Sequence, residues 1–172
     1  GVEQLVSSTV LRPGDVASAD LDGDGDIDVV SASMSAGAVY FHENLGGGAF
    51  AAEVAISTAV LSPTGLAVAD LNSDGVIDVV SSSSTDDKIA WYPGVGDGTF
   101  GPQRTITTGA DGATDVVVAD LDNDGLNDVA YCSQTDGRVR WSRNTGGTFA
   151  SPTTLDLACT GAIRIAADDL DE

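Results

Sequence analysis

Aspartates recur in three short segments of the chain, in the same order and at the same spacing. The shared pattern is D-x-[DN]-x-D-G-x-x-D, and it begins at Asp20, Asp70 and Asp120. Carboxylate or amide oxygens thus fall at loop positions one, three, five and nine, around a glycine at position six that permits a sharp turn. Hard oxygen donors in this number suit calcium, whereas zinc prefers nitrogen and sulfur ligands. We therefore predict three calcium sites; magnesium fits less well because it demands near-ideal octahedral geometry.

Each predicted site combines four side chains with one backbone carbonyl, from position seven. Crowded carboxylates repel one another without a cation, so a threefold recurrence favours metal sites over solvated acidic turns. The predicted ligands are Asp20, Asp22, Asp24, Asp28 and the Asp26 carbonyl; Asp70, Asn72, Asp74, Asp78 and the Val76 carbonyl; and Asp120, Asp122, Asp124, Asp128 and the Leu126 carbonyl.

An EF-hand loop begins with the same residues but ends differently. It needs a bidentate glutamate at position twelve and a helix on either side. Position twelve is Ser31, Ser81 or Tyr131 here, and each lies in a run of strand-forming residues. The pattern therefore predicts a metal loop that joins two strands.

The loops belong to a longer repeat with a period of about fifty residues. Residues 16–30, 66–80 and 116–130 align without gaps, and aromatic residues and glycine-rich turns follow at equivalent places. Four β-branched or alternating runs, separated by turn residues, make up each repeat, and no helical periodicity is present. An antiparallel four-stranded unit repeated in tandem is typical of a propeller blade. We predict an all-β chain, a β-propeller of four-stranded antiparallel blades.

The expected organisation is a single partial propeller over residues 1–172. The predicted blades are residues 12–61, 62–111 and 112–160. Residues 1–11 resemble the outer strand of a preceding blade, and residues 161–172 resemble the first strand and half the loop of a fourth repeat, with Asp169 and Asp171 as further ligands. Propellers have about four to eight blades, so three cannot close a ring. We expect a piece of a larger propeller, or alternatively a three-blade unit that assembles through its open edges.

These motifs together resemble the FG-GAP/VCBS repeats of integrin-α-like propellers, which carry a D-x-D-x-D-G-x-x-D calcium loop between the first two strands of a blade. The resemblance rests on Ala-Asp-Leu-Asp at 19–22 and 119–122, Ala-Asp-Leu-Asn at 69–72, and Phe100 followed by Gly101. It covers essentially the whole chain, although serine-rich segments replace the "GAP" stretch. It implies a calcium-binding propeller with a role in adhesion or assembly.

Composition narrows the classes of partner. With 27 acidic residues against 7 basic ones and a net charge of -20, nucleic acid and anionic membranes are disfavoured. No apolar run is long enough to insert into a bilayer. No catalytic motif is present, and the only histidine, His42, has no evident partner for acid-base work beyond Glu43, so we expect a surface or interface role for it and no enzyme activity.

Several functional hypotheses remain open from the sequence. Calcium loops of extracellular modules bind with dissociation constants of about 10⁻⁴ to 10⁻³ M, which favours a secreted or cell-surface protein. The leading hypothesis is a recognition scaffold for adhesion or assembly, with a protein partner. The alternatives are a lectin propeller with a glycan partner and a non-catalytic appendage of a secreted hydrolase or lyase. The remaining blades of the same protein, or a neighbouring subunit, are expected partners as well.

Three further groups of residues carry predictions. Phe41, Trp91 and Trp141 occupy equivalent places in the third strand, which favours packing between blades over stacking on sugars. The pair Cys132 and Cys159 is compatible with one disulfide or with two thiols. Three arginines lie near the third strand of the last repeat, where we expect salt bridges rather than a partner-binding patch: Arg138, Arg140 and Arg143.

Overall fold

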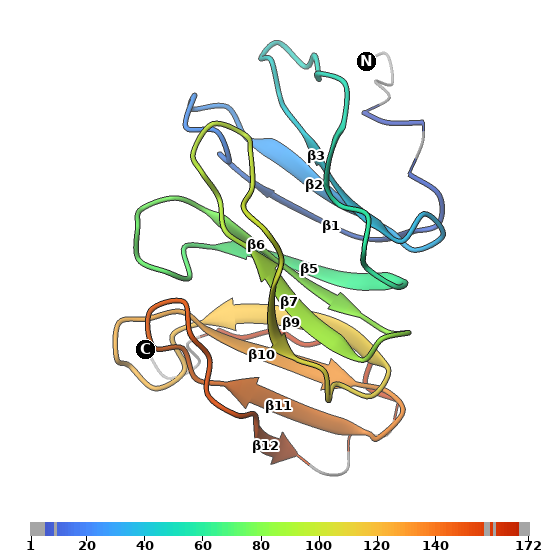
Figure 1. The fold of residues 1–172 in the computed structure, drawn as a ribbon, viewed down its shortest axis with the longest axis vertical. Helices are drawn as coiled ribbons and strands as arrows, with labels where there is room; N and C mark the ends of the chain where they lie inside the picture. The colour runs from blue at the N-terminus through green and yellow to red at the C-terminus, as the bar shows by residue number, and fades with distance from the viewer. Residues whose placement is uncertain (1–5, 9, 157–158, 160, 169–172) are drawn as a thin grey trace.

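The structure is a computed structural model, and it describes residues 6–8, 10–156, 159 and 161–168. These residues form twelve strands in three four-stranded antiparallel sheets, and each sheet takes four consecutive strands of the chain (Figure 1). In each sheet the strands lie side by side in sequence order, as hairpins joined by short connections. The predicted all-β class and the four-stranded blade are confirmed.

The strand bounds repeat at nearly constant spacing. The first sheet contains β1 (Pro13–Ala19), β2 (Asp28–Ser33), β3 (Ala38–His42) and β4 (Val54–Ser57). The second contains β5 (Pro63–Ala69), β6 (Asp78–Ser83), β7 (Lys88–Tyr92) and β8 (Arg104–Thr107). The third contains β9 (Ala113–Ala119), β10 (Asp128–Ser133), β11 (Arg138–Ser142) and β12 (Thr153–Asp156).

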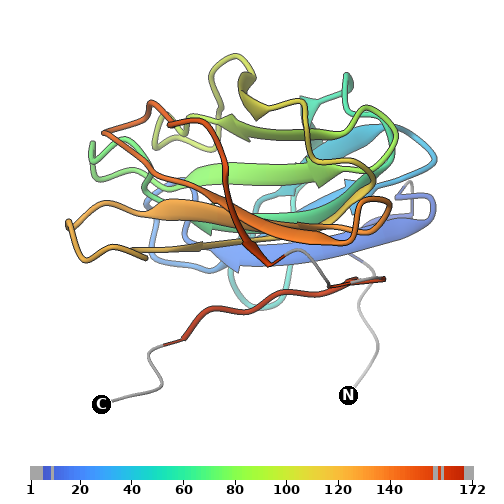
Figure 2. The ribbon, with the colours of Figure 1, turned by 90° about the horizontal axis from the view of Figure 1, so that it is seen from below.

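The sheets stack face to face, with β1 beside β5 and β5 beside β9 (Figures 1 and 2). The middle sheet is covered on both faces, so Val79 joins the core toward the first sheet while its neighbour Val80 joins the core toward the third. In the sequence, strands that are buried on both faces have continuous runs of apolar residues and serines, without alternation between apolar and charged residues. In the middle sheet, β6 is accordingly buried along its whole length.

Aromatic side chains join adjacent sheets. The Phe41 ring meets Phe100 edge to face at 6.0 Å, and Trp91 meets Phe149 in the same manner at 6.4 Å. Only 4% of Phe41 and 1% of Trp91 are exposed. The predicted packing role is therefore confirmed for these two residues, whereas Trp141 on β11 is half-buried.

Residues 161–168 lie against the third sheet much as that sheet lies against the second. The Thr64 hydroxyl donates to the Ala113 carbonyl at 2.8 Å, and the Thr114 hydroxyl donates to the Ala162 carbonyl at 2.9 Å. The two bonds are equivalent in the repeat, so this segment follows the path expected of the next inner strand along one side of the stacked sheets (Figure 2). Residues 1–5, 9 and 169–172, including Asp169 and Asp171, lie outside the described residues, and the predictions for them stay untested.

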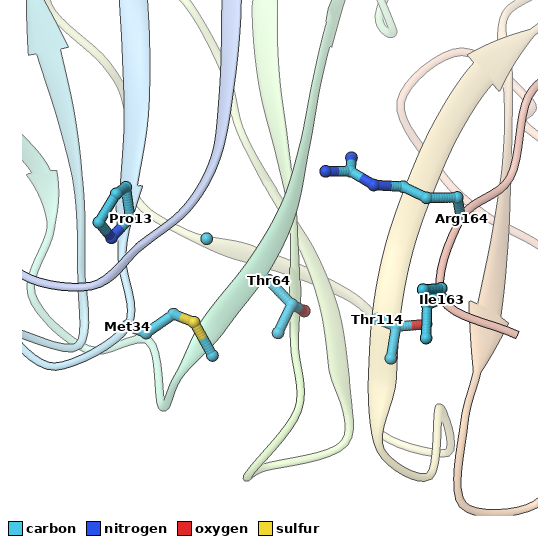
Figure 3. Close-up of a pocket in the computed structure, with 7 residues that line it drawn as sticks. Pro13, Met34, Thr64, Thr114, Ile163 and Arg164 are labelled. Atoms are coloured by element: carbon cyan, nitrogen blue, oxygen red, sulfur yellow. The ribbon is translucent and has the colours of Figure 1, made fainter. Parts of the chain in front are cut away.

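The inner strands and this segment converge on a pocket of about 230 Å³ (Figure 3). Its lining is Pro13, Gly14, Met34, Thr64, Thr114, Ile163 and Arg164. The Arg164 guanidinium lies 3.4 Å from a carboxylate oxygen of Asp15 and 3.8 Å from one of Asp115. One arginine thus connects the segment near the end of the chain to the first and third sheets.

The structure places the histidine and the two cysteines in the fold, and burial leaves only the interface alternative for the histidine. His42 is 1% exposed, not on the surface, and its Nε2 lies 2.7 Å from the Ser31 hydroxyl, because it stands where Tyr92 stands in the second sheet. Cys132 is buried and Cys159 half-buried, and no disulfide joins them in the structure, which answers the question left open by the sequence. Among the described residues, no helix has the length and apolar character needed to cross a membrane.

Candidate metal centre

Each aspartate loop connects the first and second strands of its sheet. The first loop runs from β1 to β2, the second from β5 to β6 and the third from β9 to β10. Position one follows the end of the inner strand, and position nine is the first residue of the next strand. The ladder between these two strands therefore holds both ends of every loop in place, as predicted for a metal loop between strands.

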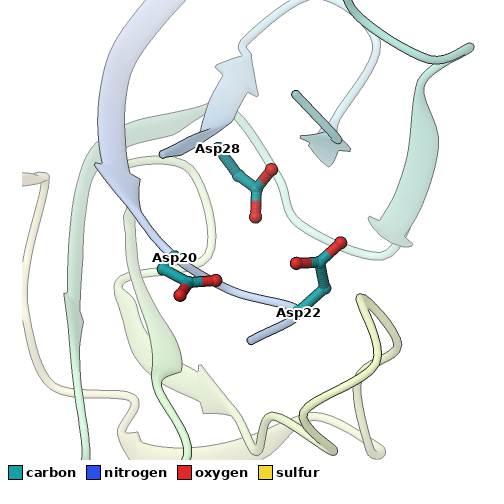
Figure 4. A group of neighbouring side chains, drawn as sticks. All are labelled: Asp20, Asp22 and Asp28. Carbon is teal, nitrogen blue, oxygen red and sulfur yellow. The ribbon is translucent and has the colours of Figure 1, made fainter. Parts of the chain in front are cut away.

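The structure brings the acidic side chains of two loops together. One oxygen from each member of either cluster lies within 4.8 Å of the others, and the clusters are Asp20, Asp22 and Asp28 in the first loop and Asp120, Asp122 and Asp124 in the third. Figure 4 shows the carboxylates of the first cluster turned toward a common space. Like charges this close repel each other, and a divalent cation bound by hard oxygens would offset that repulsion. The donor sets therefore fit calcium.

Hydrogen bonds to the backbone shape the three loops alike. The aspartate at position one accepts the N–H of the glycine at position six, at 3.1, 2.9 and 2.8 Å in loop order. The aspartate at position five accepts the N–H of position seven, at 2.8, 2.9 and 2.9 Å. These bonds fix the orientation of the carboxylates at positions one and five without a cation. The position-seven carbonyls of Asp26, Val76 and Leu126 stay predicted ligands.

The aspartate at position nine has a structural role that the sequence did not reveal. Both oxygens of Asp78 accept backbone N–H groups, from Leu71 within the loop and from Gly94 beyond β7, each at 2.8 Å. The same bonds recur around Asp28 and Asp128, and all three side chains are 0% exposed. The position-nine carboxylate therefore ties each loop to the chain that follows the third strand.

Burial also changes the electrostatics at position nine. Desolvation raises the pKa of Asp78 to about 6, against two backbone hydrogen bonds that lower it, and the nearby charges of Asp74 and Asp70 raise it further. Burial raises the pKa of Asp128 in the same direction. A carboxylate whose ionised form is disfavoured by burial and by like charges gains most from a neighbouring cation.

Asparagines beyond the third strand make further hydrogen bonds that hold the loops in place. Asn44 donates its amide to the Ile27 carbonyl at 2.9 Å, and Asn144 donates to the Asn127 carbonyl at 2.8 Å. Asn144 also donates to the Leu71 carbonyl at 2.7 Å, which connects the third blade to the second loop. The two asparagines were not among the predicted site residues, although their spacing of a hundred residues in a fifty-residue repeat is a signal in the sequence.

The second loop differs from the others in charge. Asn72 stands at position three, where the other loops have aspartate. Its amide nitrogen donates to Asp74 at 2.8 Å, and its amide oxygen accepts the Asp74 N–H at 3.0 Å. An amide oxygen can bind calcium but carries no charge. This loop therefore offers the same number of side-chain ligands with one negative charge fewer.

The third loop carries a basic side chain. Arg143 pairs through Nε with Asp122 at 2.6 Å and through Nη2 with Asp124 at 2.8 Å. The hydrogen bond from Arg143 lowers the pKa of Asp124 below its usual range. Arg138 and Arg140 both pair with Asp136 instead. The salt bridges predicted for the three arginines are therefore confirmed.

Two backbone positions in each loop are left-handed. Position six has φ of 94°, 84° and 86° at Gly25, Gly75 and Gly125, and no atom lies within 4 Å of where a Cβ would stand. Glycine is therefore needed at position six because of the left-handed φ angle, and not because a Cβ would clash with a neighbouring atom. Position four is also left-handed in all three loops, and in the second it is Ser73 at φ 61°.

We expect opposite effects from substitutions at these two positions. Gly75→Ala should destabilise the protein by about 1–2 kcal/mol, the cost of a left-handed conformation for a residue with a Cβ. Ser73→Gly should stabilise it by about 0.5 kcal/mol, because relief of strain exceeds the entropy that glycine adds to the unfolded chain. Urea denaturation in EDTA measures both values free of calcium. Equal effects of the same sign would contradict the assignment of strain to position four.

The three loops and their blades match a known family of repeats. The profile of the FG-GAP-like repeat matches residues 20–81, 70–131 and 120–172, so each match begins at position one of a loop. The chain belongs to the FG-GAP-like repeat family. Each match extends through one FG-GAP repeat into the second strand of the next, or to the end of the chain, which agrees with a period of about fifty residues. No curated protein sequence matches.

Two solved structures resemble the FG-GAP repeats of this chain. A lectin of Agrocybe aegerita, described as recognising non-reducing terminal N-acetylglucosamine, has a TM-score of 0.60 at 22% identity over 86% of this chain and 39% of the lectin. The V. cholerae biofilm matrix protein Bap1 has a TM-score of 0.39 at 19% identity over 80% of this chain and 28% of Bap1. The lectin shares the fold, and this chain spans less than half of its length.

Proposed function

We propose that this FG-GAP chain is a calcium-binding segment of an extracellular β-propeller that acts as a recognition scaffold in adhesion or assembly. The observation that supports it is the recurrence of one hydrogen-bonded loop frame in three blades, together with clustered carboxylates in the first and third loops. Independent acidic turns would not share one set of backbone bonds. Loops of this kind suit the millimolar calcium found outside cells.

Calcium would hold together parts of each blade that are distant in sequence. In the first blade, Asp20 and Asp22 come from the loop, while Asp28 begins β2 and accepts the Asn44 N–H beyond β3. A cation shared by these carboxylates would neutralise their repulsion and fix the loop against three strands. The role proposed for calcium is therefore structural: it makes the end of each blade rigid enough to present a surface.

Binding is proposed rather than catalysis. The aspartates of the loops are engaged by backbone N–H groups, which favours cation binding over proton transfer. His42 is 1% exposed and its Nε2 lies 2.7 Å from the Ser31 hydroxyl, which favours a packing role for this histidine. The alternative hypothesis, that the chain is an appendage of a secreted hydrolase or lyase, also gives it a non-catalytic role.

A glycan is the second candidate partner. It is supported by a pocket of about 280 Å³ between the first and second loops, lined by Asp20, Leu21, Gly23, Gly75, Val76, Ile77 and Gly96. The structurally similar lectin recognises a terminal sugar, although a likeness of 22% identity extends to the fold alone. Trp91 is too deeply buried to stack on a sugar, which leaves the half-buried Trp141 as the accessible tryptophan.

Calorimetric titration tests the proposed calcium sites. We expect three calcium ions per chain with dissociation constants of about 10⁻⁴ to 10⁻³ M, and weaker binding of magnesium. A triple variant, Asp20→Asn, Asp70→Asn and Asp120→Asn, removes one negative charge from each site, should bind calcium much more weakly and serves as the control. Absence of calcium binding up to 10 mM would refute the proposal.

A glycan array then separates the two classes of partner. A signal that free N-acetylglucosamine or another monosaccharide competes away would favour the lectin. A calcium-dependent interaction with a protein surface, without any competable glycan signal, would favour the scaffold. If the triple aspartate variant no longer binds the partner, the interaction depends on calcium. If it still binds the partner, the binding surface does not need calcium.

A further inference from the structure

The residue directly after the third strand differs in charge among the three blades. The registers pair Val29 with His42, Val79 with Tyr92 and Val129 with Ser142, so the residues that follow are structurally equivalent. These are Glu43, Pro93 and Arg143. One position in the repeat is thus acidic, neutral and basic in turn, while the loop beside it keeps the same frame.

Arg143 reaches the centre of the third loop. Its guanidinium contacts Asp122 at 2.6 Å and Asp124 at 2.8 Å, the carboxylates at positions three and five. Both belong to the cluster whose oxygens lie within 4.8 Å of one another. In the described part of the chain, no basic side chain pairs with the aspartates of the first or second loop. The third loop alone of these three therefore has a cation of its own.

The backbone at Arg143 is held in place. The next residue, Asn144, is 0% exposed, its N–H donates to Asp128 at 2.7 Å, and its amide donates to the Leu71 and Asn127 carbonyls. The side chain of Arg143 is half exposed, by contrast, at 50%. The guanidinium can therefore leave the loop by side-chain rotation while the backbone stays fixed.

We propose that Arg143 acts as an internal competitor for calcium and makes the third loop the weakest of the three sites. This rests on the proposed calcium-binding function. The guanidinium contacts one carboxylate oxygen of Asp122 and one of Asp124, so a calcium ion that uses these oxygens must first break two exposed ion pairs. Exposed ion pairs are individually weak, and we expect these two together to reduce the calcium affinity of the third loop about tenfold.

The blades consequently fill in order as calcium rises. The first loop, with the most negative charge, and the second loop bind at lower calcium, and the third binds when the concentration is about tenfold higher. Filling of the third loop releases the Arg143 guanidinium to solvent. A positive charge then becomes available on the surface of a chain with a net charge of -20.

Site-resolved NMR tests the order directly. The amide N–H of Gly25, Gly75 and Gly125 each donates to position one of its own loop, so each signal reports one site. In a titration of the full chain with calcium chloride, we expect the Gly125 midpoint to lie about tenfold above that of Gly25. Arg143→Ala should lower the Gly125 midpoint about tenfold and leave the other two unchanged.

Matched variants complete the test. Glu43→Arg should raise the Gly25 midpoint, because it places the same charge beside the first loop. Arg143→Lys should have an intermediate effect, since an ammonium lacks the planar fork through which separate guanidinium nitrogens contact the two carboxylates. Arg138→Ala removes a charge from β11 that pairs with Asp136 and should change no midpoint. An identical Gly125 midpoint in the wild type and Arg143→Ala would overturn the inference. If none of the three glycine signals moves with calcium, the proposed function itself fails.

Discussion

Removal of calcium with EDTA should lower the melting temperature of this protein by about 10 °C relative to the protein in 10 mM calcium chloride. A site with a dissociation constant near 1 mM stabilises the folded state by about 1.4 kcal/mol at that concentration. Three such sites contribute about 4 kcal/mol, and each kcal/mol shifts the melting temperature of a domain of this size by about 2–4 °C. Differential scanning calorimetry measures the shift.

The physical reason lies in the carboxylate clusters. Three aspartates of the first loop, and three of the third, bring oxygens within 4.8 Å of one another, and the unfolded chain has no such crowding. A cation that binds these clusters stabilises only the folded state. Excess calcium added after EDTA should restore the original melting temperature, and magnesium should restore it only in part. An unchanged melting temperature in EDTA would exclude a structural role for calcium.

The second large effect is expected from Asp78→Ala, which should destabilise the calcium-free protein by about 4 kcal/mol. The substitution leaves the backbone N–H groups of Leu71 and Gly94 without the oxygens that they contact at 2.8 Å. Each buried donor that loses its partner costs about 1–3 kcal/mol. Urea denaturation in EDTA measures this loss apart from any loss of calcium affinity.

Asp74→Ala is the matched control for this experiment. Asp74 lies in the same loop, is exposed, and accepts the Val76 N–H at 2.9 Å. We expect it to cost about 1 kcal/mol or less in EDTA, since water can replace an exposed acceptor. If Asp78→Ala does not fold, Asp78→Asn keeps one acceptor oxygen and should show a smaller loss. Equal losses for Asp74→Ala and Asp78→Ala would contradict the structural role of position nine.

The agreement between sequence and structure is closest where one short segment carries all the information. Glycine at position six predicts the left-handed turn, and the φ of 84° at Gly75 confirms it. The β-branched run after each loop predicts the second strand, which begins at Asp28, Asp78 and Asp128. The left-handed backbone at position four was missed, although glycine, serine and asparagine at that position are the signal for it.

Contacts between segments far apart in sequence were not predictable in the same way. The partners of Asp78 include the N–H of Gly94, sixteen residues later, and the position of Gly94 depends on the register between β6 and β7. Burial of His42 likewise follows from its place opposite Val29, which the residue type does not indicate. Register is a property of paired strands, so a local pattern leaves it open.

The sequence by itself determined the repeat, the four-stranded blade and the place of the three aspartate-rich loops between strands, because each depends on local spacing within about fifty residues. Tertiary structure alone decided that the carboxylate at position nine is a buried clamp and that Arg143 lies within the third loop. The physical reason is that a carboxylate has the same chemistry whether it faces calcium, a backbone N–H or a guanidinium. Only the folded arrangement of the strands selects the group that it meets.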